Sequence, residues 1–248
     1  MTQENFILFC QIWIFVAIAT FFLLMFVTAP YGRHNRKGWG FSIKNKTGWV
    51  LMELPSFGIM LYFMVAFGHS LYVYFLFVLW IVHYFNRTFI FPFRIRTKGK
   101  SMPVVIVGSA IFFNLINATT NGYFLSYFQS NDMSYESWQF ILGITFWLTG
   151  FYINIKSDNI LINLRTKEDG RYKIPKGFLF NYVSCPNHFG EIVEWLGFAI
   201  MAWNLPAWAF FIWTAANLIP RAIKHHQWYQ QKFEHYPKKR KALIPYMV

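Results

Sequence analysis

The chain has 248 residues, of which 56% are hydrophobic and only 13% are charged. In soluble domains about a quarter of the residues are charged. This composition therefore excludes an ordinary soluble protein and indicates a membrane protein. The formal net charge of +13 is also typical of nucleic-acid binders, but each basic cluster adjoins an apolar run. We therefore attribute the charge to membrane orientation and anionic lipid, and expect no nucleic-acid partner.

Six apolar stretches follow one another along the chain, over about residues 6–28, 49–67, 71–90, 103–120, 138–155 and 189–219. Each of the first five is long enough, or nearly so, to cross a ~30 Å hydrocarbon layer as one helix. The last stretch is long for one crossing and short for two. Since basic segments both precede and follow it, we expect two crossings with a turn near residues 204–206.

The basic residues define the expected orientation. All 23 Lys and Arg residues fall in the segments 29–48, 87–102, 156–188 and 220–248, which alternation puts on one side of the membrane. By the positive-inside rule this side is cytosolic. The sequence therefore predicts an all-α membrane protein with seven transmembrane helices, an outside N-terminus and a cytosolic C-terminus. We expect one domain over residues 1–248, with the cytosolic loops 29–48, 91–102 and 156–188 and the tail 220–248 forming a vestibule for a soluble ligand.

Two polar side chains are predicted at a shared shallow depth in the membrane. Glu53 lies four residues beyond Trp49, ~6 Å from the cytosolic end of its helix, and Tyr84 lies six residues before Ile90, ~9 Å deep. Arg87 follows Tyr84 by three residues, on the same face and about one turn closer to the cytosol. From the membrane interior toward the cytosol, an acid and a phenol are thus expected first and a cation after them.

Such a pair suits the recognition of a carbonyl oxygen. A phenol donates a hydrogen bond, and a carboxyl group removed from water can stay protonated at pH 7 and donate another. The same positions also fit a structural role, with Glu53 capping a helix or pairing with an arginine and Tyr84 acting as an interfacial aromatic residue. Composition and spacing leave both interpretations open.

A second polar group is predicted at the cytosolic ends of the later helices. Asn154 and Asp158 share a helix face, and Glu191 opens the next apolar run together with Glu194. The spacing i, i+4, i+8 also aligns three further residues, Arg221, His225 and Tyr229. Together these groups could hold a large polar ligand, although each one alone is equally typical of a solvated helix end.

Several motifs are absent from the sequence. It contains no glycine-rich dinucleotide fingerprint and no P-loop, so a nucleotide would have to bind through side chains from several loops. The seven histidines form no HExxH pattern, and the two cysteines, Cys10 and Cys185, form no CxxC pattern. We therefore predict no metal site and no structural disulfide.

Several segments resemble the steroid 5-alpha-reductase family of membrane reductases from about residue 48 to the C-terminus. They are MELPS at 52–56, HYFNRTF at 83–89, INIKSDNIL at 153–161, YKIPKGFLFNYVSCPNHFGEIVEW at 172–195 and RAIKHHQWYQQKFEHYPKKRKALIP at 221–245. The resemblance implies a seven-helix enzyme that uses NADPH to reduce the carbon–carbon double bond of a 3-oxo-Δ4 steroid.

The resemblance also implies residue roles. The catalytic pair that holds the 3-oxo group would be Glu53 and Tyr84. The cofactor-binding residues would be Arg87, Asn154, Asp158, Arg165, Tyr172, Asn187, Glu191, Arg221, His225 and Tyr229. The loops that contain Arg33, Asn35, Lys98 and Lys100 match the family more loosely. The expected partners are a steroid or another enone lipid from the bilayer and membrane lipid itself.

Other functions remain open from the sequence. A related enzyme could act on another lipid as a trans-enoyl reductase, a sterol reductase or an isoprenylcysteine-type methyltransferase, and a non-catalytic lipid-binding protein could share the scaffold. The expected location is the endoplasmic reticulum membrane of a eukaryote or the inner membrane of a bacterium. The oligomeric state and the physiological substrate are not predicted.

Overall fold

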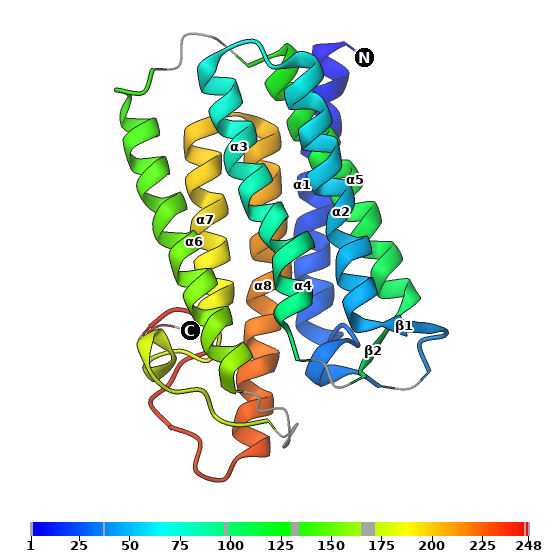
Figure 1. The fold of residues 1–248 in the computed structure, drawn as a ribbon, viewed down its shortest axis with the longest axis vertical. Helices are drawn as coiled ribbons and strands as arrows, with labels where there is room; N and C mark the ends of the chain where they lie inside the picture. The colour runs from blue at the N-terminus through cyan, green and yellow to red at the C-terminus, as the bar shows by residue number, and fades with distance from the viewer. Residues whose placement is uncertain are drawn as a thin grey trace. The chain divides into compact units, whose positions relative to one another are not determined.

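The computed structural model describes residues 2–36, 38–96, 99–129, 134–164, 172–245 and 247 (Figure 1). These residues form two compact units. One consists of Ala29–Ile141 with Ala202–Ala207, and the other of Met1–Thr28, Leu142–Met201 and Trp208–Val248. We call them the α2–α5 unit and the α6–α8 unit, after the helices that they contain.

The α2–α5 unit is built on three long helical runs, preceded by the short turn η1 (Gly32–His34). They are α2 (Asn45–Phe67), α5 (Val104–Tyr127) and a run in which α3 (Leu71–Phe85) continues through the π-turn η2 (Asn86–Ile90) into α4 (Phe91–Arg94). Ser70 caps the start of α3, because its hydroxyl accepts a hydrogen bond from the Val73 amide at 3.2 Å. A π-turn inside a helix is rare and frequently marks a functional position.

A small ribbon joins the ends of α2 and α5. Strand β1 (Ser42–Lys44) pairs antiparallel with β2 (Ser101–Pro103), and Ile43 lies opposite Met102. The helices α2 and α5 begin directly after the two strands (Figure 1). The Met102 side chain is fully buried against Gly48 of α2, where an added Cβ would lie 2.6 Å from its sulfur. The absence of a side chain at Gly48 therefore lets the ribbon pack onto the helix.

The α6–α8 unit contains α1 (Gln3–Phe26), α6 (Trp138–Leu164, from Leu142 on), the short turn η3 (Phe178–Asn181), α7 (Pro186–Ala202, up to Met201) and α8 (Leu205–Lys232, from Trp208 on). Helices α6 and α7 run side by side (Figure 1) and touch through glycines. An added Cβ at Gly150 would lie 2.5 Å from the Gly190 carbonyl, and one at Gly143 would lie 2.7 Å from the Gly197 carbonyl. Small residues let helix backbones approach closely, as in other membrane helix pairs.

The break between α7 and α8 confirms the turn predicted near residues 204–206. Trp203 and Asn204 are outside both helices, and Asn204 Oδ1 accepts a hydrogen bond from the Ala207 amide at 2.9 Å. This bond is a helix N-cap, which satisfies one of the free amides at the start of α8. The side-chain amide of Asn204 also donates to Gln129 Oε1 at 2.9 Å.

The C-terminal segment returns to the segment that precedes α7. Val183 and Lys241 form a parallel bridge, and the Ser184 amide donates to the Lys241 carbonyl at 2.8 Å. Behind this bridge an apolar cluster contains Cys185, Ala222, Ala242 and Leu243. Both cysteines of the chain, Cys10 and Cys185, are free and buried.

Five helices of the described residues are long and apolar enough to cross a membrane: Gln3–Phe26, Asn45–Phe67, Leu71–Arg94, Val104–Tyr127 and Trp138–Leu164. They correspond to the first five predicted stretches. Their outer faces carry large exposed apolar side chains, among them Phe15, Val65 and Phe112, as expected for surfaces that face lipid. Within the described part of the chain, α7 and α8 do not meet the same criteria of length and hydropathy.

Candidate active site

Glu53 and Tyr84 are linked through a third side chain, Asn114 of α5. The Tyr84 hydroxyl donates to Asn114 Oδ1 at 3.3 Å, and Asn114 Nδ2 donates to Glu53 Oε2 at 3.4 Å. The same Nδ2 donates to the Met52 carbonyl at 2.7 Å. The predicted acid and phenol therefore belong to one hydrogen-bonded group, contributed by α2, α3 and α5.

Aromatic contacts hold the Tyr84 ring in place. The Trp80 ring stacks on it, with the ring centroids 5.5 Å apart and the planes inclined by 21°. The indole of Trp80 donates in turn to Ser56 Oγ at 3.2 Å. Tyr84 is buried, whereas Glu53 is only partly buried. The phenol is thus fixed by its ring, and Glu53 keeps part of its surface exposed.

Arg87 lies in the π-turn η2, one turn beyond Tyr84. Its guanidinium carbon is 4.7 Å from the centre of the Trp49 ring and 4.8 Å from that of Phe91. Cation–π contacts of this kind hold a guanidinium against an aromatic face. Because Trp49 precedes Glu53 by one helical turn, these contacts hold Arg87 near the start of α2, toward the ribbon.

Four of the predicted cofactor residues form a hydrogen-bonded cluster within the α6–α8 unit. Asn154 Nδ2 donates to the Asn187 carbonyl at 3.0 Å and to Glu191 Oε2 at 3.2 Å. Asn187 Nδ2 donates to Asp158 Oδ1 at 3.2 Å. The structure therefore brings together two amides and two carboxylates from α6 and α7.

The glycine contact of α6 and α7 makes this cluster possible. An added Cβ at Gly190 would lie 2.6 Å from the Asn154 amide nitrogen. Only at such a backbone separation can the short side chain of Asn154 reach the Asn187 carbonyl. A structural feature of the helix pair thus sets the geometry of the polar cluster.

The predicted residues of α8 lie along its last turns. His225 is buried with its ring centroid 5.5 Å from that of His188, and Tyr229 is buried against Tyr236. Arg221 is partly buried one turn before His225. Tyr172 contacts the Trp228 ring, with the centroids 4.9 Å apart. Arg165 lies outside the described residues, as does Lys98.

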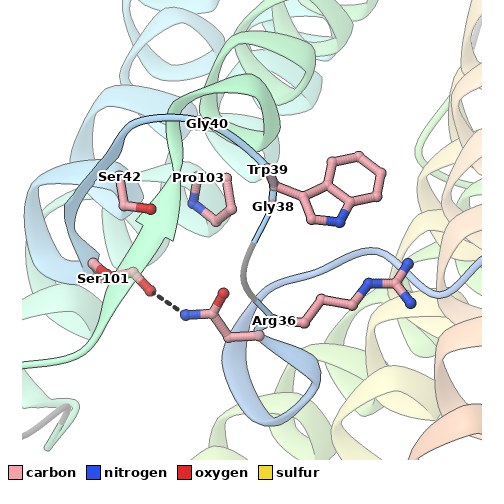
Figure 2. Close-up of a pocket in the computed structure, with 8 residues that line it drawn as sticks. Arg36, Gly38, Trp39, Gly40, Ser42, Ser101 and Pro103 are labelled. Atoms are coloured by element: carbon pink, nitrogen blue, oxygen red, sulfur yellow. Dashed lines mark hydrogen bonds between the residues drawn. The ribbon is translucent and has the colours of Figure 1, made fainter.

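A polar pocket of about 350 Å³ lies beside the ribbon (Figure 2). Its lining comes from the loop before β1 and from both strands, and consists of Asn35, Arg36, Gly38, Trp39, Gly40, Ser42, Ser101 and Pro103. The Asn35 amide crosses the pocket to donate to the Ser101 carbonyl at 3.1 Å, whereas the Arg36 guanidinium lies 5.6 Å from the Trp39 ring centre. Of the residues discussed from the sequence, only Asn35 lines this pocket.

The comparisons with known proteins extend along nearly the whole chain. Residues 100–248 match the family model for 3-oxo-5-alpha-steroid 4-dehydrogenase. The steroid 5-alpha-reductase DET2 of Arabidopsis thaliana is 40% identical over 258 aligned positions, which cover 100% of this chain and 98% of the relative. The 3-oxo-5-alpha-steroid 4-dehydrogenase 1 of Bos taurus is 39% identical over 244 positions, covering 94% and 93%. The protein of the same name from Homo sapiens is 41% identical over 226 positions, covering 88% and 85%.

The chain belongs to the 3-oxo-5-alpha-steroid 4-dehydrogenase family. The resemblance seen in the sequence is thereby confirmed. As a member of this family the chain is an oxidoreductase, and its five long apolar helices make it a multi-pass membrane protein.

Sequence reasoning missed one residue of this hydrogen-bonded group, Asn114. The signal was present, because Asn114, Asn117 and Asn121 recur at i, i+3 and i+7 within an otherwise apolar helix. Polar residues inside membrane helices are candidates for function by default. All three asparagines are buried. The structure distinguishes Asn114, which bonds to the side chains of Glu53 and Tyr84, from Asn121, whose described bonds go to backbone carbonyls.

Proposed function

We propose that this protein transfers a hydride from NADPH to the C4–C5 double bond of a 3-oxo-Δ4 steroid, with Glu53 and Tyr84 polarising the 3-oxo group. The observation that carries the proposal is the shared hydrogen-bonded group of Glu53, Tyr84 and Asn114 in three apolar helices. The names of the relatives, steroid 5-alpha-reductase and 3-oxo-5-alpha-steroid 4-dehydrogenase, support the same substrate class.

The chemistry requires donors at the carbonyl oxygen. When a hydride adds to C5, the π electron pair of the enone moves toward the oxygen, and a proton taken up at C4 completes the saturated ketone. Donors aimed at the oxygen stabilise the negative charge that develops there. We assign this task to the hydroxyl of Tyr84 and to the protonated carboxyl group of Glu53.

The donor set of the α6–α8 unit fits a dinucleotide. Carboxylates such as Asp158 and Glu191 accept hydrogen bonds from ribose hydroxyls, and a guanidinium group such as that of Arg221 pairs with phosphates. NADPH, when bound, supplies the hydride. The proposed cofactor-binding residues are Arg87, Asn154, Asp158, Arg165, Tyr172, Asn187, Glu191, Arg221, His225 and Tyr229. A carboxamide and carboxylate cluster at a buried helix contact is otherwise an expensive arrangement in an apolar protein.

We propose the seven-helix topology with an outside N-terminus and a cytosolic C-terminus. The charge pattern supports this orientation, since the 23 basic residues are confined to the four segments 29–48, 87–102, 156–188 and 220–248. The steroid then partitions into the helices from lipid, and the cofactor binds from the cytosol. The host membrane is that of the endoplasmic reticulum in a eukaryote, or the inner membrane in a bacterium.

The test is an assay of purified protein in detergent or lipid nanodiscs. Addition of a 3-oxo-Δ4 steroid should cause the absorbance of NADPH to fall as the cofactor is oxidised, and chromatography should identify a 5α-dihydro product. We expect Glu53→Gln and Tyr84→Phe each to lower turnover by about 10² or more while NADPH affinity stays near that of the parent. Two matched controls, Glu136→Gln in an exposed turn and Tyr62→Phe on an exposed helix face, should keep full turnover. Wild-type turnover in Glu53→Gln or Tyr84→Phe would refute the assigned role.

A further inference from the structure

Asn114 is a primary amide in the middle of the apolar helix α5, with only 3% of its surface exposed. Taking such an amide out of water is costly unless each of its polar atoms is hydrogen-bonded. The described bonds satisfy this condition. Its two N–H hydrogens are donated to the Met52 carbonyl and to Glu53 Oε2, and its oxygen accepts a hydrogen bond from the Tyr84 hydroxyl.

The orientation of the amide follows from the shortest of these contacts. A backbone carbonyl can only accept, so the group 2.7 Å from the Met52 oxygen must be the NH₂ of Asn114. The Oδ1 atom then faces Tyr84, and because Oδ1 can only accept, the hydroxyl of Tyr84 must donate to it. The backbone of α2 thereby sets the direction of the Tyr84 O–H bond.

The same constraint acts on Glu53. A hydrogen of Asn114 Nδ2 points at Glu53 Oε2, so that a proton on Oε2 would face another donor hydrogen. A protonated Glu53 therefore carries its proton on Oε1. We propose, on the basis of the function proposed above, that Asn114 is a positioning residue that directs the Glu53 proton to Oε1 and gives the Tyr84 hydroxyl a resting acceptor.

This arrangement favours the transition state over the bound substrate. In the resting site the Tyr84 hydroxyl donates to a neutral amide oxygen. As negative charge develops on the carbonyl oxygen, a hydrogen bond to that oxygen becomes about twice as strong as one to a neutral acceptor, and the hydroxyl turns toward it. Interactions that strengthen only in the transition state raise kcat. Asn114 thus keeps Tyr84 from binding the ground-state ketone fully.

The test uses Asn114→Leu, which keeps the approximate volume of the side chain but removes all three hydrogen bonds. We expect kcat to fall by about 10- to 100-fold with the NADPH dissociation constant changed by less than about 2-fold. In isotope-edited infrared spectra of a bound steroid labelled at the 3-oxo carbon, the carbonyl frequency should fall, because the Tyr84 hydroxyl has lost its resting acceptor and donates fully to the ground-state ketone. Asn121→Leu is the matched control, because this buried amide of the same helix donates to the backbone carbonyls of Asn117 and Pro206. It should lower thermal stability without changing turnover per folded protein or the carbonyl frequency.

A second variant and a cycle of mutations complete the test. Asn114→Asp keeps an acceptor for Tyr84 but loses the amide hydrogens, and should also lower kcat if Asn114→Leu does not fold. In a Tyr84→Phe background Asn114→Leu should cost much less than in the parent, because a positioning residue acts through its partner. Wild-type kcat and carbonyl frequency in both Asn114 variants would overturn the inference. So would a double variant in which the fold-loss of kcat equals the product of the losses of Asn114→Leu and Tyr84→Phe, because the two residues would then act independently. Failure of the proposed function is a separate result, seen as wild-type turnover in Glu53→Gln and Tyr84→Phe themselves.

Discussion

The hydroxyl oxygen of Ser184 lies 2.6 Å from Nδ1 of His226, at the place where the C-terminal segment meets α8. Ser184 Oγ also donates to the Lys241 carbonyl at 3.0 Å, and Gln230 Nε2 lies 2.8 Å from His226 Nε2. Since Ser184 uses its hydrogen on the carbonyl and the Gln230 amide donates to Nε2, the neutral His226 ring carries its hydrogen on Nδ1. This network connects the tail to α8, the helix that carries three of the proposed cofactor residues, Arg221, His225 and Tyr229.

Acid should weaken the network. Burial, followed by the positive charges of Arg240 and Lys241, lowers the pKa of His226 below its ordinary value. At acidic pH the folded protein therefore binds fewer protons at this site than the unfolded chain. The contribution of His226 is fully present above the ordinary pKa of about 6.5 and is lost as pH falls from there through the lowered pKa. Melting temperatures of the parent and of His226→Gln, measured against pH, should converge on acidification, and parallel curves would contradict the prediction.

Removal of a single hydroxyl should loosen the tail. The Tyr236 hydroxyl lies 2.6 Å from Ser184 Oγ and accepts from Arg240 at 3.5 Å, while its ring stacks on Tyr229 with an interplanar angle of 9°. Tyr236→Phe keeps the stack but leaves buried polar partners unsatisfied, which costs about 1–3 kcal/mol of stability. Chemical denaturation should detect this loss, with NADPH affinity of the folded protein little changed. Tyr236→Ala removes the stack as well, and should also weaken NADPH binding through Tyr229.

A methyl group at Gly150 should disrupt the contact of α6 with α7. An added Cβ there would overlap the backbone nitrogen of Glu194, and backbone cannot move aside as a flexible side chain can. We expect Gly150→Ala to cost about 3 kcal/mol or to abolish folding. Gly58→Ala is the matched control, because a Cβ at this position of α2 meets nothing within 4 Å. It should stabilise the helix by up to about 1 kcal/mol. Equal melting temperatures for the two variants would refute the close packing.

Arg87 and Lys156 offer a comparison between a specific and a nonspecific charge. Arg87→Ala removes the guanidinium held over Trp49 and Phe91, and should raise the NADPH dissociation constant by about 10-fold or more. Lys156 is also cationic and lies 4.5 Å from the Phe178 ring centre, but it is not among the proposed cofactor residues. Lys156→Ala should therefore change the dissociation constant by less than about 2-fold. Titration of each purified variant with NADPH measures the dissociation constant. Equal changes in the two variants would indicate that Arg87 acts only through nonspecific electrostatic attraction of the anionic cofactor.

The helices could be predicted from hydropathy, but their ends could not. The predicted stretches 103–120 and 138–155 correspond to α5 and α6, which continue to Tyr127 and Leu164. A hydropathy pattern marks the part of a helix that is in lipid, whereas the hydrogen-bonded helix continues into polar residues such as Asp158. The ribbon of β1 and β2 gave no signal either, because three residues per strand are too few for an alternating pattern.

The candidate site could be predicted residue by residue only where a motif was present. Glu53 and Tyr84 follow from the resemblance, and the depth argument put them at one level. Asn114 lies 61 residues beyond Glu53 in sequence, and no local pattern indicates which of three buried asparagines turns toward α2. The π-turn at Arg87 was also missed, since an extra residue in a helical turn leaves no mark in the periodicity of so apolar a run.

The burial of Cys10 and Cys185 makes the native chain suitable for chemical labelling as it stands. Thiol-reactive reagents modify accessible cysteines, so a cysteine introduced at the surface would be labelled with little background from the two native cysteines. Ser42→Cys in the ribbon and Glu136→Cys in the turn before α6 are both exposed positions. In sealed vesicles a membrane-impermeant maleimide should modify the two from opposite sides. The same two handles would accept fluorophores or spin labels for measuring motion in the folded enzyme.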